Sequence, residues 1–319
     1  SDESSIRSAT TERSMEATMR GVVRATVLVM VAMVVGCGGG RESAWDTTPS
    51  DEPAVETTAE QRQTLAQQAA EAWAGRDEEA NIRRAVELYG QLVSAEPNNA
   101  EHSVWLSRAN YFLADCHLSF DEAKREEMMS TYDTGTRAAE RALVTLSSDF
   151  ADRMRAGTRI EEAVGVLDAT AVPALYWRAS NLGKWASADG FATLLSYKDE
   201  IRAVMGRCLE LDREYFYYGP DRYFGVFYGR APSFAGGDVA RSREHFETSL
   251  RHHPNYFATR VLMAQDYATK AQDRALFEEQ LNTVINGDPE AGGPELAPEN
   301  RCEQRKARNL LTQADELFE

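Results

Sequence analysis

The sequence predicts an all-α fold, built from irregular tetratricopeptide-like helical hairpins that form a solenoid or bundle. Apolar residues recur at helical spacing from about residue 57 onward, and no Asn-Gly or Asp-Gly turn lies between alternating apolar runs. Two helix-ending prolines, Pro254 and Pro289, stand roughly 34 residues apart, which is the period of a tetratricopeptide repeat. An ordinary helical bundle whose loops share this spacing is the alternative interpretation.

The clearest repeat lies between residues 236 and 289. Phe246 occupies the large position of its helix. Ser242 and Ser249 occupy positions that must be small, because paired helices approach closely there. Ala264 takes the corresponding small position in the following unit. We therefore expect helix pairs packed through small residues in this half of the chain.

An earlier repeat spans residues 66–99. Ala85, Tyr89 and Pro97 stand at its small, large and closing-proline positions. The period then breaks, because a highly charged helix over residues 124–146 is longer than a repeat helix should be. The sequence thus predicts repeats at each end and an irregular section between them.

Residues 1–36 are predicted to be an upstream extension followed by a lipoprotein signal peptide. The first eighteen residues are polar, so translation is expected to start at Met15 or Met19. Two arginines then precede the apolar run 25–35, which at about eleven residues is too short to span a bilayer comfortably. This pattern is typical of a secretion signal.

The four residues 34–37 (VVGC) have the form of a bacterial lipobox, which predicts lipidation of Cys37. A plain signal peptide with an incidental cysteine is the alternative. Several acyl chains anchor a protein far more firmly than one. No aspartate follows the cysteine to suggest retention in the inner membrane. If the source is Gram-negative, we therefore expect the protein to be anchored to the outer membrane and to face the periplasm.

Residues 37–56 are predicted to be a flexible lipidated tether, and residues 57–319 to be one helical domain. The tether is rich in Ser, Thr, Pro and acidic residues, a composition that cannot bury a core. Thr57 with Glu60, or Thr58 with Gln61, marks the first helix as a capping box. A net charge of −16 argues against nucleic acid and against an adhesive patch for anionic lipid.

Two segments in the irregular middle carry unusual side chains. Residues 173–188 (PALYWRASNLGKWASA) place two tryptophans on one predicted helix with Arg178, Asn181 and Lys184. Residues 215–232 (YFYYGPDRYFGVFYGRAP) are far richer in aromatic residues than the average of 9% for the chain. Such clusters can line a groove for a ligand or partner. They can equally fill the junction between repeats.

Together with the lipobox and the irregular repeats, these two segments resemble the T component of TRAP transporters, the TatT-like lipoproteins. The resemblance covers residues 63–319 and is most specific over 173–254. It implies a periplasmic lipoprotein of helical hairpins that forms trimers and associates with the solute-binding P component of a TRAP system. It also implies a cavity or channel that takes up the ligand passed on by that partner.

The family that the sequence resembles has no consensus set of catalytic residues to transfer to this chain. The matching positions are candidates for the cavity or the partner-facing surface: Tyr176, Trp177, Arg178, Asn181, Lys184, Trp185, Arg222, Tyr223 and Arg230. Arg178 and Arg222 are the predicted polar anchors for a ligand with an apolar body and an acidic head, whereas Lys184 is expected to face solvent or the partner. Alternatively, both arginines form salt bridges to neighbouring acidic residues.

The sequence lacks the motifs that would indicate an enzyme, a bound cofactor or a metal site. There is no G-x-S-x-G, Walker loop, G-x-G-x-x-G or H-E-x-x-H. With Cys37 lipidated, Cys116, Cys208 and Cys302 remain, and they allow at most one intramolecular disulfide. Cys116 and Cys208 have apolar neighbours, so both are expected to be buried free thiols.

Two other functions stay open at this point. A general tetratricopeptide adaptor for cell-envelope assembly would share the anchor, but would present a concave surface lined by Asn and Lys. A ligand channel would instead be lined by aromatic and aliphatic residues. A hydrolase hidden in the irregular middle is the third hypothesis, and no nucleophile motif supports it.

Overall fold

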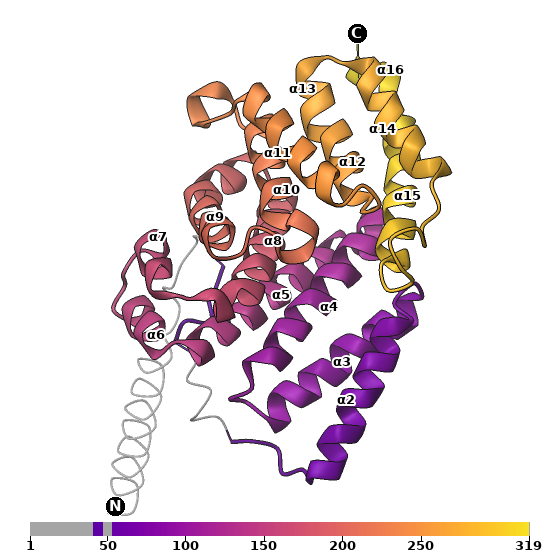
Figure 1. Cartoon of the computed structure of the whole chain (residues 1–319). Coiled ribbons are helices and arrows are strands. Elements are labelled where there is room, and N and C mark those ends of the chain that lie inside the picture. Colours follow the sequence, from indigo (N-terminus) through magenta and orange to yellow (C-terminus); the bar gives the residue numbers. More distant parts are fainter. Residues whose placement is uncertain (1–40, 47–52, 319) are drawn as a thin grey trace, which may run out of the picture. The chain divides into compact units, whose positions relative to one another are not determined.

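The computed structural model describes residues 41–46 and 53–318. The chain divides between residues 42 and 43 into two units, and every helix described below belongs to the second, residues 43–319. The predicted signal peptide and Cys37 lie outside the described residues. Figure 1 shows the second unit as a succession of helices that pack side by side.

The helices of the second unit begin with α2 and end with α16. In chain order they are α2 (Ala59–Ala74), α3 (Glu79–Ala95), α4 (Ala100–Cys116), α5 (Arg125–Leu146), α6 (Ser148–Arg155), α7 (Ile160–Ala163), α8 (Val172–Asp189), α9 (Phe191–Leu211), α10 (Tyr215–Arg230), α11 (Val239–His252), α12 (Ala258–Leu262), α13 (Thr269–Ala271), α14 (Arg274–Asn286), α15 (Ala297–Leu311) and α16 (Ala314–Leu317). A π-helical stretch, η7 (Met263–Ala268), joins α12 to α13.

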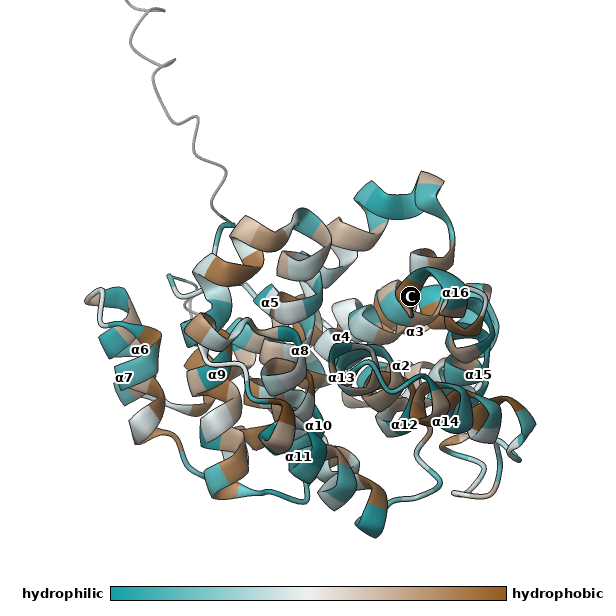
Figure 2. Ribbon diagram, turned by 90° about the horizontal axis from the view of Figure 1, so that it is seen from above, coloured by the Kyte–Doolittle hydropathy of each residue, from teal (hydrophilic) through white to brown (hydrophobic). Residues whose placement is uncertain are grey.

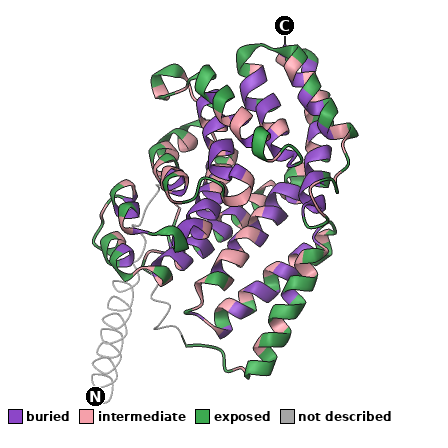
Figure 3. Cartoon of the chain, viewed as in Figure 1, coloured by how far each residue is buried: buried purple, intermediate pink, exposed green. Residues whose placement is uncertain are grey.

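Consecutive helices pack as hairpins: α2 on α3, α4 on α5, α8 on α9 and α10 on α11. No strand occurs in residues 53–318, so the prediction of an all-α, solenoid-like fold is confirmed. Figure 3 shows burial concentrated in α5 and α8, whereas α2 is mostly exposed. The chain enters α2 through a capping box, in which Thr58 and Gln61 exchange hydrogen bonds with each other's backbone N–H groups.

Small residues lie where helices meet. Ala85, Ser242, Ser249 and Ala264 are all completely buried, as the repeat register requires. One predicted helix differs from expectation, because the helix that carries Ala264 becomes π-helical through η7. π-Helical turns are frequent at functional sites.

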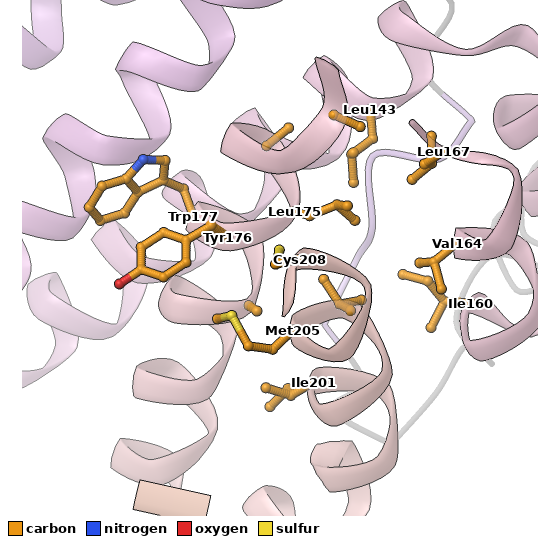
Figure 4. Packing of buried hydrophobic residues seen from close by; sticks show 14 of the residues in the cluster. Leu143, Ile160, Val164, Leu167, Leu175, Tyr176, Trp177, Ile201, Met205 and Cys208 are labelled. Atoms are coloured by element: carbon orange, nitrogen blue, oxygen red, sulfur yellow. The ribbon is translucent and has the colours of Figure 1, made fainter. Parts of the chain in front are cut away.

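The largest hydrophobic cluster lies around α8 and α9 and includes Leu143, Leu175 and Met205. Each fully buried leucine contributes about 1.5–3 kcal/mol through removal of its apolar surface from water. Hydrophobic and hydrophilic segments alternate along α5, α8 and α9, as amphipathic helices require (Figure 2). In Figure 4, Tyr176 and Trp177 lie at the opposite end of this cluster from Val164.

A disulfide joins Cys116 of α4 to Cys302 of α15, across 186 residues of sequence. The expectation of a free thiol at Cys116 is therefore wrong. Sequence neighbours could not reveal the pairing, because it depends on α15 returning to α4 at the end of the fold. Cys208 is free and buried as expected, and burial raises the pKa of its thiol.

Candidate ligand cavity

A cavity of about 990 Å³ lies inside the second unit. Its walls come from α4, α8, α9, α10, α15 and the segment from α12 to α13. Most lining side chains are aromatic or aliphatic, and the aromatic ones include Tyr111, Tyr176, Trp177, Phe216, Tyr223 and Tyr256. The cavity has the size and the apolar lining of a small-molecule site.

Helical spacing explains how each wall presents its residues. On α8, the lining positions run from Tyr176 through Ser180, Gly183 and Lys184 to Ala188. Steps of three, four and seven residues stay on one helical face, and twelve residues advance about 18 Å along the axis. The cavity therefore extends along most of α8.

The two sequence segments with unusual aromatic content meet at this cavity. Among the predicted site residues, those that line it are Tyr176, Trp177, Lys184, Arg222, Tyr223 and Arg230. Trp177 also donates a hydrogen bond from Nε1 to the hydroxyl oxygen of Tyr215, at 3.2 Å, which ties α8 to the start of α10. The remaining candidates, Arg178, Asn181 and Trp185, are not among the lining residues.

Arg178 lies on another face of α8, in an ion-pair network. Its guanidinium is 1% exposed, lies 3.1 Å from the carboxylate of Glu140 and also pairs with Glu200. The same Glu140 accepts a hydrogen bond from the backbone N–H of Ala44, at 2.8 Å. The ring of Trp45 stacks 4.9 Å from the guanidinium of Arg178. Arg178 thus holds part of the predicted tether against the helical body, and the salt-bridge interpretation applies to it.

Asn181 and Trp185 pack between helices. The amide of Asn181 is completely buried and donates to the backbone oxygen and the hydroxyl of Ser107, at 3.2 and 3.1 Å. Trp185 makes an edge contact with the ring of Tyr197, at a centroid distance of 5.7 Å. Both side chains therefore join α8 to a neighbouring helix, α4 or α9 respectively.

Arg222 stabilises an unusual turn at the start of α10. Phe216, Tyr217 and Tyr218 have left-handed backbones, with φ values of 48°, 60° and 56°. A left-handed conformation costs a non-glycine residue about 1–2 kcal/mol. Arg222 donates hydrogen bonds to the carbonyls of Phe216 and Tyr217, and to the hydroxyl of Tyr176. The guanidinium of Arg222 therefore bonds to backbone carbonyl groups. With the residues that the structure describes, it does not form the salt bridge to an acidic side chain that was the alternative interpretation.

Gly219 allows this turn to approach α8. A Cβ atom at Gly219 would lie 2.4 Å from the ring of Tyr176, closer than the 3.0 Å that real Cβ atoms keep from other side chains. Only glycine therefore lets the aromatic turn pack directly over Tyr176. Burial raises the pKa of Tyr215, in the same region, to about 12.

Three ion pairs involve charged residues of the cavity wall. Asp115 of α4 pairs with Lys184 of α8 at 2.6 Å and with Lys306 of α15 at 2.5 Å. Burial favours the neutral acid, but the two ammonium groups outweigh it and hold the pKa of Asp115 well below its ordinary value. Arg230 pairs with Asp266 of η7 at 2.8 Å, and there burial raises the pKa of the carboxyl group.

Sequence reasoning missed the contribution of α4 and α15 to this site. Arg108, Tyr111 and Asp115 line the cavity from α4, and Glu299 and Lys306 line it from α15. Both sets follow helical steps of three, four or seven residues, and this mixture of charge and aromatic residues on one face was the available signal. Among the described residues, no group of three or more His, Cys, Asp or Glu side chains could hold a metal ion.

The model of one protein family, the TRAP transporter T-component, matches residues 109–318. The chain therefore belongs to this family, whose members are accessory subunits of a transport system rather than known enzymes. A search of the curated proteins finds no match. Within residues 41–46 and 53–318, none of the helices combines the length and the apolar composition that a transmembrane span needs.

Proposed function

We propose that this TRAP transporter T-component takes up a small, partly apolar ligand in its internal cavity, after a solute-binding P component has delivered it. The observation that carries the proposal is the cavity itself, which holds about 990 Å³ between aromatic and aliphatic walls. Apolar walls bind the body of such a ligand by removing its surface from water.

The character of the lining supports a ligand channel over a general adaptor. An adaptor that binds peptides would present Asn and Lys along a concave surface. The cavity does contain Asn309 and three lysines, but aromatic and aliphatic residues make up most of its wall. Two of these lysines, Lys184 and Lys306, are already paired with Asp115 and are not presented to a peptide.

The proposal includes a cellular setting. Lipidation at Cys37 would hold the protein on the periplasmic face of the outer membrane, where a soluble P component can reach it. Association of three copies would place three cavities side by side. No catalytic step is part of this function, because uptake and transfer require only binding.

Co-purification tests the proposal. The tagged protein is purified from its own membranes, and mass spectrometry identifies both the proteins and the small molecules that accompany it. We expect a TRAP solute-binding protein and one class of amphiphilic molecule. Recovery of outer-membrane assembly factors, with an empty cavity, would favour the adaptor instead.

A further inference from the structure

Arg108 of α4 is a cation in the cavity wall whose ion pair with Glu299 is long. In the described part of the chain its guanidinium makes no hydrogen bond, and its Nε atom is buried without an acceptor. The nearest carboxylate is that of Glu299, 3.6 Å from an Nη atom. A guanidinium carries five N–H donors, so Arg108 has unused capacity that faces the cavity.

Aromatic rings enclose this guanidinium. Its centre lies 4.7 Å from the ring of Trp73, 5.1 Å from Trp105, 5.5 Å from Trp177 and 5.0 Å from Phe216. Contacts with ring faces hold the cation in place but satisfy none of its N–H groups. Arginine stacked in this way keeps its edge available for a planar, bidentate acceptor such as a carboxylate.

The charge at this end of the cavity is unbalanced. Arg76 and Arg108 both pair with the carboxylate of Glu299, and the guanidiniums of Arg108 and Arg222 both lie against the ring of Phe216. Glu299 is already committed to Arg76, at 2.5 Å. Arg222 is occupied by the backbone carbonyls of Phe216 and Tyr217. Of the three arginines, Arg108 is therefore the one whose N–H donors are least engaged.

The other cations of the cavity differ in this respect. Lys184 and Lys306 share Asp115, and Lys306 also lies 2.6 Å from Glu303. Arg230 is paired with Asp266. Placing an anion on any of these would require an ion pair of 2.5–2.8 Å to break, whereas Arg108 would give up only its 3.6 Å contact with Glu299.

We propose that Arg108 binds the acidic head group of an amphiphilic ligand, whose apolar body extends from Trp177 along α8. This inference rests on the proposed function, because it assumes that the cavity takes up a ligand. It adds the orientation of that ligand and the residue that selects it. The N–H groups at the edge of the Arg108 guanidinium bind the acidic head group. The apolar body lies against the aromatic wall formed by Tyr111 and Tyr223.

Binding of three small probes tests the assignment. The full chain carries Cys37→Ser throughout, so that no detergent is needed to purify it. Calorimetry then compares dodecanoate with dodecanol, which has the same body and no charge, and with acetate, which has the charge and no body. We expect dodecanoate to bind at least roughly tenfold more tightly than either, because a charge-assisted hydrogen bond adds to burial of the chain.

Two substitutions make the test specific. Arg108→Gln should weaken dodecanoate roughly ten- to hundredfold and leave dodecanol nearly unchanged. Arg251→Gln removes the same charge from an exposed position and should alter neither. Glu299→Gln removes the competing carboxylate and should tighten dodecanoate, a gain that misfolding cannot imitate.

The outcomes separate the two proposals. If the wild type binds dodecanoate and dodecanol alike, or if Arg108→Gln weakens both equally, the head-group assignment is overturned and uptake by the cavity stands. Weaker binding of dodecanoate by Glu299→Gln would also overturn the assignment. If the wild type binds none of the probes, uptake of a partly apolar ligand fails, and the assignment fails with it.

Discussion

The ammonium of Lys184 lies 2.6 Å from the carboxylate of Asp115, which joins α8 to α4 across the wall of the cavity. The second oxygen of Asp115 pairs with Lys306 of α15. Tyr132 of α5 donates a hydrogen bond to the same carboxylate, at 3.2 Å. One buried aspartate thus connects four helices around the candidate site.

Asp115→Asn should destabilise the protein by about 3 kcal/mol at pH 6, because two ammonium groups would lose their buried partner. The loss is expected at the lower end of the usual range, since the Lys184 side chain is 39% exposed and can turn to water. The pKa of Asp115 is lowered in the folded state, so its contribution is complete above its ordinary pKa of 3.8.

Urea unfolding at several pH values checks this prediction. As the pH falls below 3.8 toward the lowered pKa of the folded state, the stability difference between wild type and Asp115→Asn should shrink. A difference that stays constant from pH 6 to acid conditions would show that the charge of Asp115 does not stabilise the fold.

Loss of the disulfide between Cys116 and Cys302 should destabilise the fold by about 2–5 kcal/mol, because the bridge closes a long loop in the unfolded chain. Cys302→Ser, measured by thermal unfolding, tests this. Cys208→Ser removes a thiol outside the disulfide and provides a control for non-reducing gel mobility. If Cys302→Ser migrates like the wild type on such a gel, the bridge does not form.

Ala85→Trp and Ala264→Trp should each destabilise the helical body by about 1–3 kcal/mol, because a large ring overpacks a close helix contact. Both alanines are completely buried, whereas Ala80 of α3 is exposed. Ala80→Trp is therefore the matched control and should leave the melting temperature nearly unchanged. Equal melting temperatures for all three variants would refute the repeat register.

Cys37→Ser should release the protein from the membrane fraction, because the acylated cysteine is the proposed anchor. Labelling with a fatty-acid probe provides the readout, and the wild type should carry the label. Retention of the label on Cys37→Ser would place the lipid elsewhere.

Local sequence patterns were sufficient to predict an all-α fold of helical hairpins. The small residues at Ala85 and Ser242 identify close helix contacts directly, because side-chain volume limits how near two helices can come. The aromatic segments 173–188 and 215–232 were likewise visible in the sequence. Both segments contribute to the cavity wall.

Contacts between distant segments were not visible. The partner of Cys116 lies 186 residues away, and the partners of Arg178 come from α5 and α9. Whether an arginine faces a cavity or a carboxylate depends on the rotation of its helix in the assembled fold. Arg178 and Arg108 illustrate both outcomes, since the first is paired in the interior and the second faces the cavity.

The central claim is that the cavity takes up a ligand, and Gly183→Trp tests it most directly. Gly183 lines the cavity, and a Cβ atom there would have no neighbour within 4 Å, so the indole can enter the empty space without disturbing the helix. Gly206→Trp is the control, because Gly206 is equally unobstructed on α9 but does not line the cavity.

Native purification followed by mass spectrometry of the bound small molecule is the decisive measurement. We predict that the wild type and Gly206→Trp carry the molecule, whereas Gly183→Trp loses it with its melting temperature retained. If folded Gly183→Trp still carries the molecule in the same amount as the wild type, the cavity is not where the ligand binds.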